Sequence, residues 1–257
     1  MDKQEIIKKI ISKKEFSQLP EKDVETAFEM FNRERYSDDE KVKMARDLLR
    51  KVFSVFTSRK LLKRRDYEPD WILKKHISTK ERYKYYEELY NRILRDSERR
   101  INVIDLGAGV NGFSYRHFPV KVYYTAVEAI GQLVDLMNRF FNRERFDALA
   151  IHKSLFDIGE IKELIKNCKG EKIIFLLKVI DSLEMMKRNY SKKLLLEITP
   201  LADKIVVSFA MQSLIARKKF RINRNWIVQF IDENFAILED FVLGEERYLI
   251  FRSKVRQ

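Results

Sequence analysis

The feature of this sequence that most constrains its fold is a change in the spacing of apolar residues near residue 100. Beyond that point, short runs rich in β-branched and aromatic residues alternate with stretches of helical spacing, which is typical of a parallel sheet with crossover helices. The pattern predicts strands at residues 101–106, 120–127, 148–152, 172–177 and 204–209. A helix at 225–232 and two strands at 235–242 and 247–252 follow, with a tight turn at 243–246 between these strands. We therefore expect an α/β, Rossmann-like sheet that ends in a β-hairpin.

The first part of the chain has a different pattern, because its apolar residues recur at helical spacing up to residue 99. Pro20 and Ser37 stand ahead of two such stretches, and each offers a fixed φ or a capping side chain at a helix start. Three or four short helices are predicted, with a bend at residues 67–70. We expect two domains, a helical one at residues 1–75 and an α/β one at residues 76–257.

The charge balance favours a polyanionic partner. The chain has 52 Lys and Arg residues against 39 Asp and Glu residues, a formal net charge of +13 and a sequence pI of about 9.6. Basic side chains that neutralise phosphates release bound counterions, so nucleic acids are attracted to such surfaces. A solvated basic surface explains the charge equally well, and charge alone leaves both interpretations open.

The single cysteine and the lack of long apolar runs limit which cellular compartments and which kinds of site are compatible with the sequence. Cys168 is the single cysteine, so the chain can form no internal disulfide and no cysteine-rich zinc site. No apolar run approaches the roughly 20 residues of a membrane helix, and residues 1–11 lack the apolar core of a secretion signal. We expect a cytoplasmic protein without a membrane span or a bound metal.

A glycine-rich loop follows the first predicted strand. Gly107, Gly109 and Gly112 have the spacing of a dinucleotide-binding loop, which is a weak indication by itself. Asp105 precedes the first glycine by two residues, where its carboxylate would repel a pyrophosphate but can accept hydrogen bonds from the ammonium group of a methionine. The loop therefore favours S-adenosylmethionine over NAD as the cofactor, and an NAD-dependent dehydrogenase is the formal alternative.

Polar residues at the ends of the next two strands fit a nucleoside. Glu128 ends the second strand, at the usual position of a carboxylate that holds ribose hydroxyls. Ser154 and Asp157 follow the third strand, and either could reach the adenine. Taken alone, Glu128 could equally be a carboxylate that faces solvent at the end of a strand and binds no ribose. Together with the hairpin that closes the sheet, these residues favour the class I S-adenosylmethionine-dependent methyltransferase fold.

Three segments of the chain resemble the ribosomal RNA guanine-N7 methyltransferases that confer aminoglycoside resistance. The first is similar to a His-Ala-Ser-Thr-Lys/Arg-Glu-Arg motif and reads His76, Ile77, Ser78, Thr79, Lys80, Glu81, Arg82. The second, the loop from Asp105 to Gly112, resembles the family's Asp-x-Ala-Cys-Gly-x-Asn-Pro. The third consists of short pieces in chain order, namely Phe175 to Lys178, Ser208 with Phe209, and Arg217 with Lys219. Because the segments occur in order, the resemblance covers nearly the whole chain.

The resemblance implies a cofactor, a substrate and roles for particular residues. The implied cofactor is S-adenosylmethionine, the implied partner is the 16S ribosomal RNA of the small ribosomal subunit, and the helical domain would dock on that subunit as a monomer. Arg82 would bind the methionine carboxylate, whereas Lys178 and Arg217 would lie at the target guanine as the catalytic residues. The rest of the expected cofactor site comprises Asp105, Gly107, Ala108, Gly109, Glu128, Ala129, Ser154, Leu155 and Leu177.

The sequence departs from the family motifs at several positions. Ala108 and Gly112 stand where the loop motif has cysteine and proline, and Asp181 replaces a proline after the fourth strand. Ser154 stands at the position of an acidic residue that contacts adenine, and Gln212 at that of an arginine. A role in drug resistance does not follow from the resemblance.

The available residues fit a reaction that needs no general base. Guanine N7 has a free lone pair, so methyl transfer to it requires alignment and no proton acceptor. Cytosine-C5 methylation needs a cysteine, but Cys168 precedes the fourth strand, at the sheet edge opposite the expected cofactor. Lys178 and Asp181 form the alternative, a lysine-and-acid site for ribose 2′-O methylation, unless Asp181 simply caps the next helix.

A basic segment follows the fifth strand, near the expected active edge of the sheet. The residues expected to bind RNA phosphates are Lys218, Lys219, Arg221 and Arg224. Phe220 and Trp226 lie among them, as expected for a loop that meets phosphates and unstacked bases. A solvated basic loop is the ordinary alternative. One alternative to an enzyme also remains, namely an RNA-binding protein that kept the methyltransferase fold and lacks catalytic activity.

Overall fold

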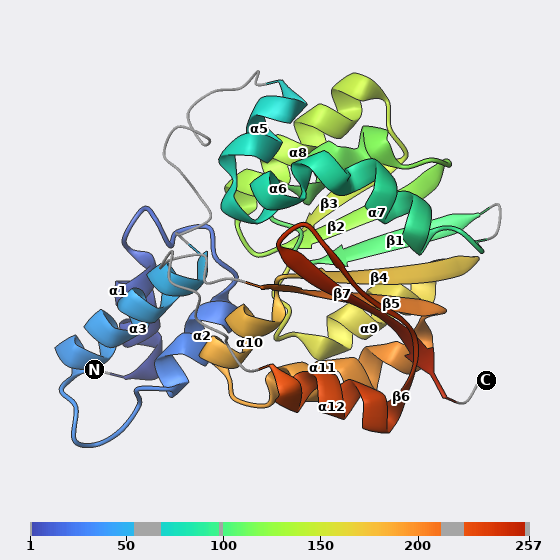
Figure 1. Cartoon of the computed structure of the whole chain (residues 1–257). Helices are drawn as coiled ribbons and strands as arrows, with labels where there is room; N and C mark the ends of the chain where they lie inside the picture. The colour runs from blue at the N-terminus through green and yellow to red at the C-terminus, as the bar shows by residue number, and fades with distance from the viewer. Residues whose placement is uncertain (1, 54–67, 98–99, 212–223, 255–257) are drawn as a thin grey trace.

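The described residues of the computed structural model are 2–53, 68–97, 100–211 and 224–254. Figure 1 shows two parts, of which the first consists of helices α1 (Lys3–Ile11), α2 (Glu21–Glu29) and α3 (Asp38–Phe53). The second part is a sheet with helices on both faces.

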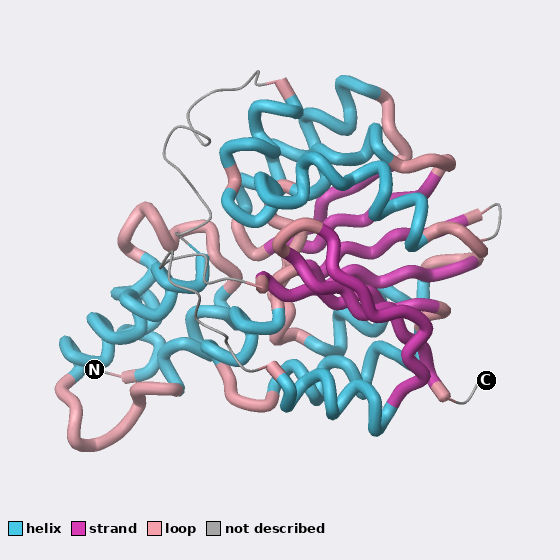
Figure 2. The backbone as a smooth tube through the Cα atoms, viewed as in Figure 1, coloured by secondary structure: helices cyan, strands magenta, loops and turns pink. Residues whose placement is uncertain are grey.

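A seven-stranded sheet forms the centre of this second part, as Figure 2 shows. Its strands are β1 (Ile101–Leu106), β2 (Val122–Glu128), β3 (Ala148–His152), β4 (Glu171–Leu177), β5 (Lys204–Ala210), β6 (Phe235–Leu243) and β7 (Glu246–Ser253). They lie in the order β3-β2-β1-β4-β5-β7-β6. The first five are parallel, whereas β7 is antiparallel to both β5 and β6. The predicted parallel strands and terminal hairpin are therefore confirmed, with bounds that shift by two residues at most.

Helices cover both faces of the sheet (Figure 1). One face carries α5 (Pro69–Lys75), α6 (Ile77–Arg82), α7 (Tyr86–Ile93) and α8 (Gly131–Glu144). The other face carries α9 (Ile158–Asn167), α10 (Ile180–Met186), α11 (Tyr190–Ile198) and α12 (Asn225–Asn234). Short 3-10 helices lie at η2 (Tyr83–Tyr85), η3 (Asn111–His117) and η4 (Thr199–Leu201).

Strand β1 illustrates how the sequence specifies this layered core. All six of its residues are buried, as expected for a central parallel strand covered on both sides. Because side chains alternate across a strand, Val103 joins the apolar cluster that contains α7 and α8. The next residue, Ile104, joins the cluster that contains α9 and α11.

The region before β1 contains more helices than the sequence predicts. Its described residues form six α-helices, from α1 to α7, instead of three or four. Only His76 separates α5 from α6, and only a 3-10 turn separates α6 from α7, so these breaks leave the apolar periodicity nearly unchanged. The expected bend is instead the start of α5, where Pro69 occupies the first helical turn with its fixed φ.

Helix α5 packs with the helices of the sheet domain. It contacts α6 and η3, and its Ile72 and Leu73 are buried. The predicted domain boundary after residue 75 therefore falls between two helices that contact each other. We refer to α1, α2 and α3 as the N-terminal helical unit, which contacts the sheet domain where α3 meets α10.

Candidate functional site

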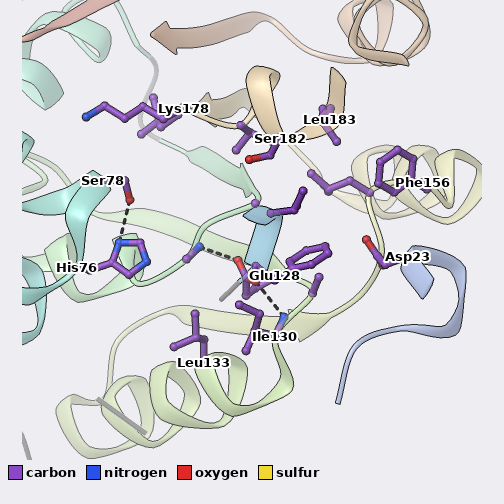
Figure 3. A pocket seen from close by; sticks show the side chains of 18 residues that line it. Asp23, His76, Ser78, Glu128, Ile130, Leu133, Phe156, Lys178, Ser182 and Leu183 are labelled. Atoms are coloured by element: carbon purple, nitrogen blue, oxygen red, sulfur yellow. Dashed lines mark hydrogen bonds between the residues drawn. The ribbon is translucent and has the colours of Figure 1, made fainter. Parts of the chain in front are cut away.

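A pocket lies at the carboxyl ends of the parallel strands, where the sheet domain meets the N-terminal helical unit (Figure 3). Residues after β1, β2, β3 and β4 line it, together with residues of α2, α3 and α10. This edge is where open α/β sheets bind ligands. The residues expected from the sequence that line this pocket are Gly107, Gly109, Glu128, Ala129, Leu155, Leu177 and Lys178.

The loop after β1 needs glycine at two positions that line the pocket. Gly107 has a φ of +75° and Gly109 a φ of +58°, which is the left-handed region that favours glycine. A Cβ atom on Gly107 would also lie 2.7 Å from Cγ2 of Val179. The amide of Gly107 donates to the carbonyl oxygen of Val127 at 2.8 Å, which fastens the loop to β2. The two glycines therefore let the main chain itself form part of the pocket wall.

Glu128 is the buried acidic group beside this loop. Its Oε2 accepts a hydrogen bond from the Gly109 amide at 2.8 Å, and its Oε1 accepts one from the Ile130 amide at 2.9 Å. Burial raises the pKa of Glu128 above its ordinary value, while the amide donors of Ile130 and Gly109 oppose that rise. Since a carboxylate has about four acceptor positions, it can still accept hydrogen bonds from the hydroxyl groups of a ligand.

Asp105 does not line the pocket, in contrast to the direct ligand contact expected from the sequence. Its Oδ2 accepts hydrogen bonds from Nδ2 of Asn111 at 2.7 Å and from the hydroxyl of Tyr124 at 2.6 Å. Burial raises the pKa of Asp105, and these two hydrogen bonds oppose the rise. The carboxylate is part of the buried strand β1, and it supports the glycine loop from behind by holding Asn111.

Arg82 is also buried away from the pocket. Its Nη2 donates to Oε1 of Glu246 at 2.6 Å, and both side chains are at most 2% exposed. Its Nη1 donates to Oδ1 of Asn111 at 3.0 Å, and its Nε donates to the hydroxyl of Tyr248 at 3.2 Å. The guanidinium thus joins α6 to β7. Because Arg82 is buried and does not line the pocket, binding of a methionine carboxylate, the role implied by the resemblance, would require the side chain or its neighbours to move.

Lys178 lines the pocket and completes a buried ionic network. Its ammonium group contacts the carboxylate of Glu81 and lies 3.2 Å from Oε2 of Glu246. Burial alone would raise the pKa of Glu246, but the adjacent Arg82 and Lys178 lower it below its ordinary value. Lys178 has a φ of +60°, an uncommon conformation for a residue with a side chain. Backbone strain of this kind occurs preferentially at functional sites.

The lysine-and-acid pair of the alternative chemistry is not formed among the described contacts. Asp181 Oδ2 accepts a hydrogen bond from Nη2 of Arg224 at 2.6 Å. Arg224 also donates to the carbonyl oxygen of Ala210 at 2.6 Å, so this expected RNA contact is engaged within the protein. The other basic candidates, Arg217, Lys218, Lys219 and Arg221, lie outside the described residues.

His76 forms part of the pocket wall next to the glycine loop. Its Nδ1 lies 2.8 Å from the hydroxyl oxygen of Ser78, and a Cβ atom on Gly109 would lie 3.2 Å from its ring. Burial and the positive charges of Arg82 and Lys178 together lower the pKa of His76 to about 4. The imidazole is therefore neutral at physiological pH.

Two features of the pocket differ from what the sequence indicates. The hydroxyl of Ser154 is buried and accepts a hydrogen bond from the Phe156 amide at 3.0 Å, so Leu155 and Phe156 line the pocket in its place. Asp23 of α2 lines the pocket from the N-terminal helical unit. No local pattern marks Asp23 as a site residue, because acidic side chains in the first turn of a helix are ordinary.

Three further expectations from the sequence concern Cys168, metal ligands and membrane-spanning helices. Cys168 lies before β4, and its thiol donates to the carbonyl oxygen of Leu164 at 3.4 Å, so it is far from the ends of the strands that line the pocket. In the part of the chain that the structure describes, no group of three or more His, Cys, Asp or Glu side chains is placed to hold a metal ion. Within the same residues, no helix combines the length and the apolar surface needed to cross a membrane.

Solved structures match nearly the whole chain, although no protein-family model and no curated protein sequence matches it. The structure is similar to the 16S rRNA methyltransferase RmtF in complex with S-adenosyl-L-homocysteine, with 21% identity and a TM-score of 0.79 over 98% of this chain and 100% of that chain. It is also similar to the 16S rRNA methylase RmtB, with 18% identity and a TM-score of 0.77 over 99% of each chain. An rRNA methylase from Escherichia coli has the same identity and TM-score, over 98% of this chain and 99% of that chain.

Proposed function

We propose that this chain, which has the fold of the class I S-adenosylmethionine-dependent methyltransferases, transfers a methyl group to the 16S ribosomal RNA of the small ribosomal subunit. The observation that carries the proposal is the pocket in which the buried Glu128 carboxylate meets the amide of Gly109 at the carboxyl ends of β1 and β2. RmtF, which is similar over nearly its whole length, holds S-adenosyl-L-homocysteine and is a 16S rRNA methyltransferase. The formal net charge of +13 suits a ribosomal RNA substrate.

The pocket residues fit the parts of the cofactor, and S-adenosylmethionine supplies an activated methyl group. Glu128 accepts hydrogen bonds from the ribose hydroxyls, as a carboxylate at the end of the second strand does in nucleoside sites. Ile130 and Phe156 offer apolar walls to the base, on the side of the pocket away from Lys178 (Figure 3). Gly107 and Lys178 would hold the methionine part, and Asp105 supports the glycine loop through Asn111.

Guanine N7 is the target atom that the site suits best. N7 carries a lone pair and no proton, so the protein has only to align it with the methyl group. Lys178 contacts Glu81 and Glu246, and these contacts hold its ammonium group in place, so it is arranged to position a base or a phosphate and is not placed as a proton acceptor. Ribose 2′-O methylation, the second candidate, needs such an acceptor.

The RNA-binding surface in this proposal combines the N-terminal helical unit with the basic segment after β5. Arg217 contacts the target nucleotide, and Lys218, Lys219 and Arg221 contact phosphates, which position the RNA without specifying its sequence. Arg224 joins them only if it releases Asp181. The protein acts in the cytoplasm, where ribosomal subunits are found, and as a monomer.

Calorimetry tests the cofactor assignment. S-adenosylhomocysteine, the product form of the cofactor, should bind to the full chain, and NAD should not. Binding of NAD in its place would indicate a dehydrogenase. RNA binding without either nucleotide would indicate a catalytically silent RNA-binding protein.

Borohydride reduction followed by aniline cleavage tests the target atom, because this chemistry cuts RNA at N7-methylguanine. After incubation of small subunits with the enzyme and S-adenosylmethionine, strand scission is expected at one guanine of the 16S ribosomal RNA. Methylation confined to a ribose 2′-oxygen would contradict the N7 assignment and leave the cofactor assignment intact.

A further inference from the structure

Asp23 is a buried acidic residue that the N-terminal helical unit contributes to the pocket. It lies in the first turn of α2, is 2% exposed and lines the pocket. Its Oδ2 has no hydrogen-bond partner among the described residues. Figure 3 shows a carboxyl oxygen of Asp23 turned toward the pocket, on the side of Phe156. Because a buried oxygen without a partner is costly, this geometry is typical of a group that binds a ligand.

The groups that face Asp23 do not neutralise a negative charge on it. Burial raises the pKa of Asp23, hydrogen bonding with Ser154 opposes the rise, and the charge of Glu128 adds to it, which together give a pKa of about 7. Tyr190 of α11 is close enough that burial and the charge of Asp23 together raise the pKa of its hydroxyl. The carboxyl group of Asp23 is therefore substantially protonated near neutral pH, and can donate as well as accept a hydrogen bond.

The end of the pocket beside Asp23 fits a flat base. Leu155, Phe156 and Ile130 line the pocket with apolar side chains. If the ribose lies at Glu128, the base and the methionine part extend in opposite directions from it. Lys178 and Ser78 lie on the other side of Glu128 from Asp23 and Phe156 (Figure 3), so Asp23 marks the base end.

We propose that Asp23 recognises the amino edge of the adenine base, so that the N-terminal helical unit supplies part of the cofactor site. The inference rests on the proposed function, because it takes the ligand to be S-adenosylmethionine. A neutral carboxyl group matches this edge with two hydrogen bonds, since its hydroxyl donates to N1 and its carbonyl oxygen accepts from the 6-amino group. An ionised carboxylate accepts from the amino group but repels the N1 lone pair. Ser154 does not compete for this edge, because it does not line the pocket; its oxygen accepts from the Phe156 amide, and it hydrogen-bonds with Asp23.

This contact also strengthens the attachment of the N-terminal helical unit to the sheet domain. Without ligand, α3 contacts α10, and the Gly131 amide donates to the carbonyl oxygen of Gln18 at 3.4 Å. A hydrogen bond from Asp23 to bound adenine adds a link through α2. Cofactor binding should therefore slow amide hydrogen exchange in α2.

Calorimetry with two ligands tests the inference on the full chain. The ligands are S-adenosylhomocysteine and its analogue that lacks the 6-amino group. The wild-type protein should bind the first about tenfold more tightly, which is the order expected for one lost hydrogen bond in a buried site. Asp23→Ala should bind both ligands equally. Glu25→Gln, on the same helix, is the matched control and should keep the wild-type preference.

Asp23→Asn separates recognition of the base from a merely structural role. The asparagine amide has the donor and acceptor of a neutral carboxyl group, so this variant should keep the preference for the 6-amino ligand. In the wild type, affinity for S-adenosylhomocysteine should fall between about pH 6 and about pH 8, because the binding form of Asp23 is protonated. Asp23→Asn should show no such fall. Glu128 and Tyr190 also face this position, but they are present in both proteins and would affect both curves.

The outcomes distinguish the inference from the proposed function. Retention of the 6-amino preference in Asp23→Ala would overturn the inference alone. If Asp23→Ala does not fold, an unchanged pH dependence in Asp23→Asn overturns it instead. Failure of the wild-type protein to bind either ligand would overturn the inference and the proposed function together.

Discussion

Lys178 combines three properties that rarely occur together, namely a positive φ, a buried ammonium group and a position on the pocket wall. The carboxylates of Glu81 and Glu246 hold the side chain in place. Because these partners come from α6 and β7, the position of Lys178 depends on elements far apart in the chain.

Replacement of this side chain tests whether it acts on the target or on the cofactor. Lys178→Ala should reduce methyl transfer by about 100-fold, because a misplaced target loses its alignment with the methyl group. Its affinity for S-adenosylhomocysteine should change by about threefold at most, since the proposal places Lys178 at the target. Single-turnover assays and calorimetry measure the two effects. Lys153→Ala, which removes a lysine paired with Glu160 after β3, is the control. Equal losses of turnover and affinity would place Lys178 at the cofactor instead.

The sequence predicts those pocket residues that lie at, or directly after, the carboxyl end of a parallel strand. Gly107, Glu128 and Leu177 line the pocket because each lies at the carboxyl end of a parallel strand. The sequence could not show that Arg82 is bound to Glu246, because the two lie 164 residues apart in the chain. It also could not bring Asp23 to the pocket, because that placement depends on how the N-terminal helical unit packs on the sheet domain.

The contact between α6 and β7 depends on the buried ion pair of Arg82 and Glu246. Arg82→Met should destabilise the protein by about 3 kcal/mol, because it leaves the buried carboxylate of Glu246 with Lys178 as the one cation beside it among the described residues. Arg247→Met is the matched control on β7, where the pair with Asp240 is 32% and 38% exposed, and it should cost less than about 1 kcal/mol. Denaturant unfolding measures both values. Similar losses in the two variants would contradict this account of the contact.

The pH dependence of the same pair follows from the pKa of Glu246. That pKa is lowered in the folded protein, so the pair stabilises the fold at any pH above the ordinary value of a glutamate. The stabilisation is lost as the pH falls through the lowered value. The difference in stability between the wild type and Arg82→Met should therefore shrink in acid.

A substitution that adds one methyl group to the glycine loop tests whether the backbone conformation of this loop is needed for cofactor binding. Gly107→Ala should destabilise the protein by about 1–3 kcal/mol, because alanine is strained at this φ and its Cβ would meet Val179. It should also abolish binding of S-adenosylhomocysteine. Gly159→Ala in α9 is the control, since its Cβ would have only Asp157 nearby, at 3.9 Å, and it should stabilise the helix by about 0.5 kcal/mol. Cofactor binding by a stable Gly107→Ala variant would count against the assigned role of the loop.

The sequence predicts the bounds of the strands better than those of the helices that precede the sheet. Residues 101–106 and 148–152 were predicted with the bounds that β1 and β3 have in the structure, because both are short β-rich runs between polar segments. The helices α5, α6 and α7 could not be separated, because breaks of one to three residues do not change an apolar pattern. Packing on the sheet, and not local propensity, sets these boundaries.

For the whole molecule, the sequence predicted a basic protein with a helical part and a cofactor-binding part. Neutralisation of Arg217, Lys218 and Lys219 should flatten the salt dependence of RNA binding by up to about 3 units of slope, one for each phosphate contact. Affinity for S-adenosylhomocysteine should not change. Neutralisation of Lys121, Arg143 and Arg145, which precede β2 and β3 at the opposite edge, is the control. An unaltered slope in the first variant would identify the basic segment as solvated surface.

The measurement that tests the central claim most directly is transfer of a tritiated methyl group from S-adenosylmethionine to purified small ribosomal subunits. Label should enter the 16S ribosomal RNA, and it should enter assembled subunits faster than naked RNA. Glu128→Gln should reduce this transfer, because the variant changes a residue of the pocket proposed to hold the cofactor and leaves the basic segment after β5 unchanged. If the protein binds S-adenosylhomocysteine but labels neither subunits nor ribosomal RNA, the claim that it methylates ribosomal RNA is wrong.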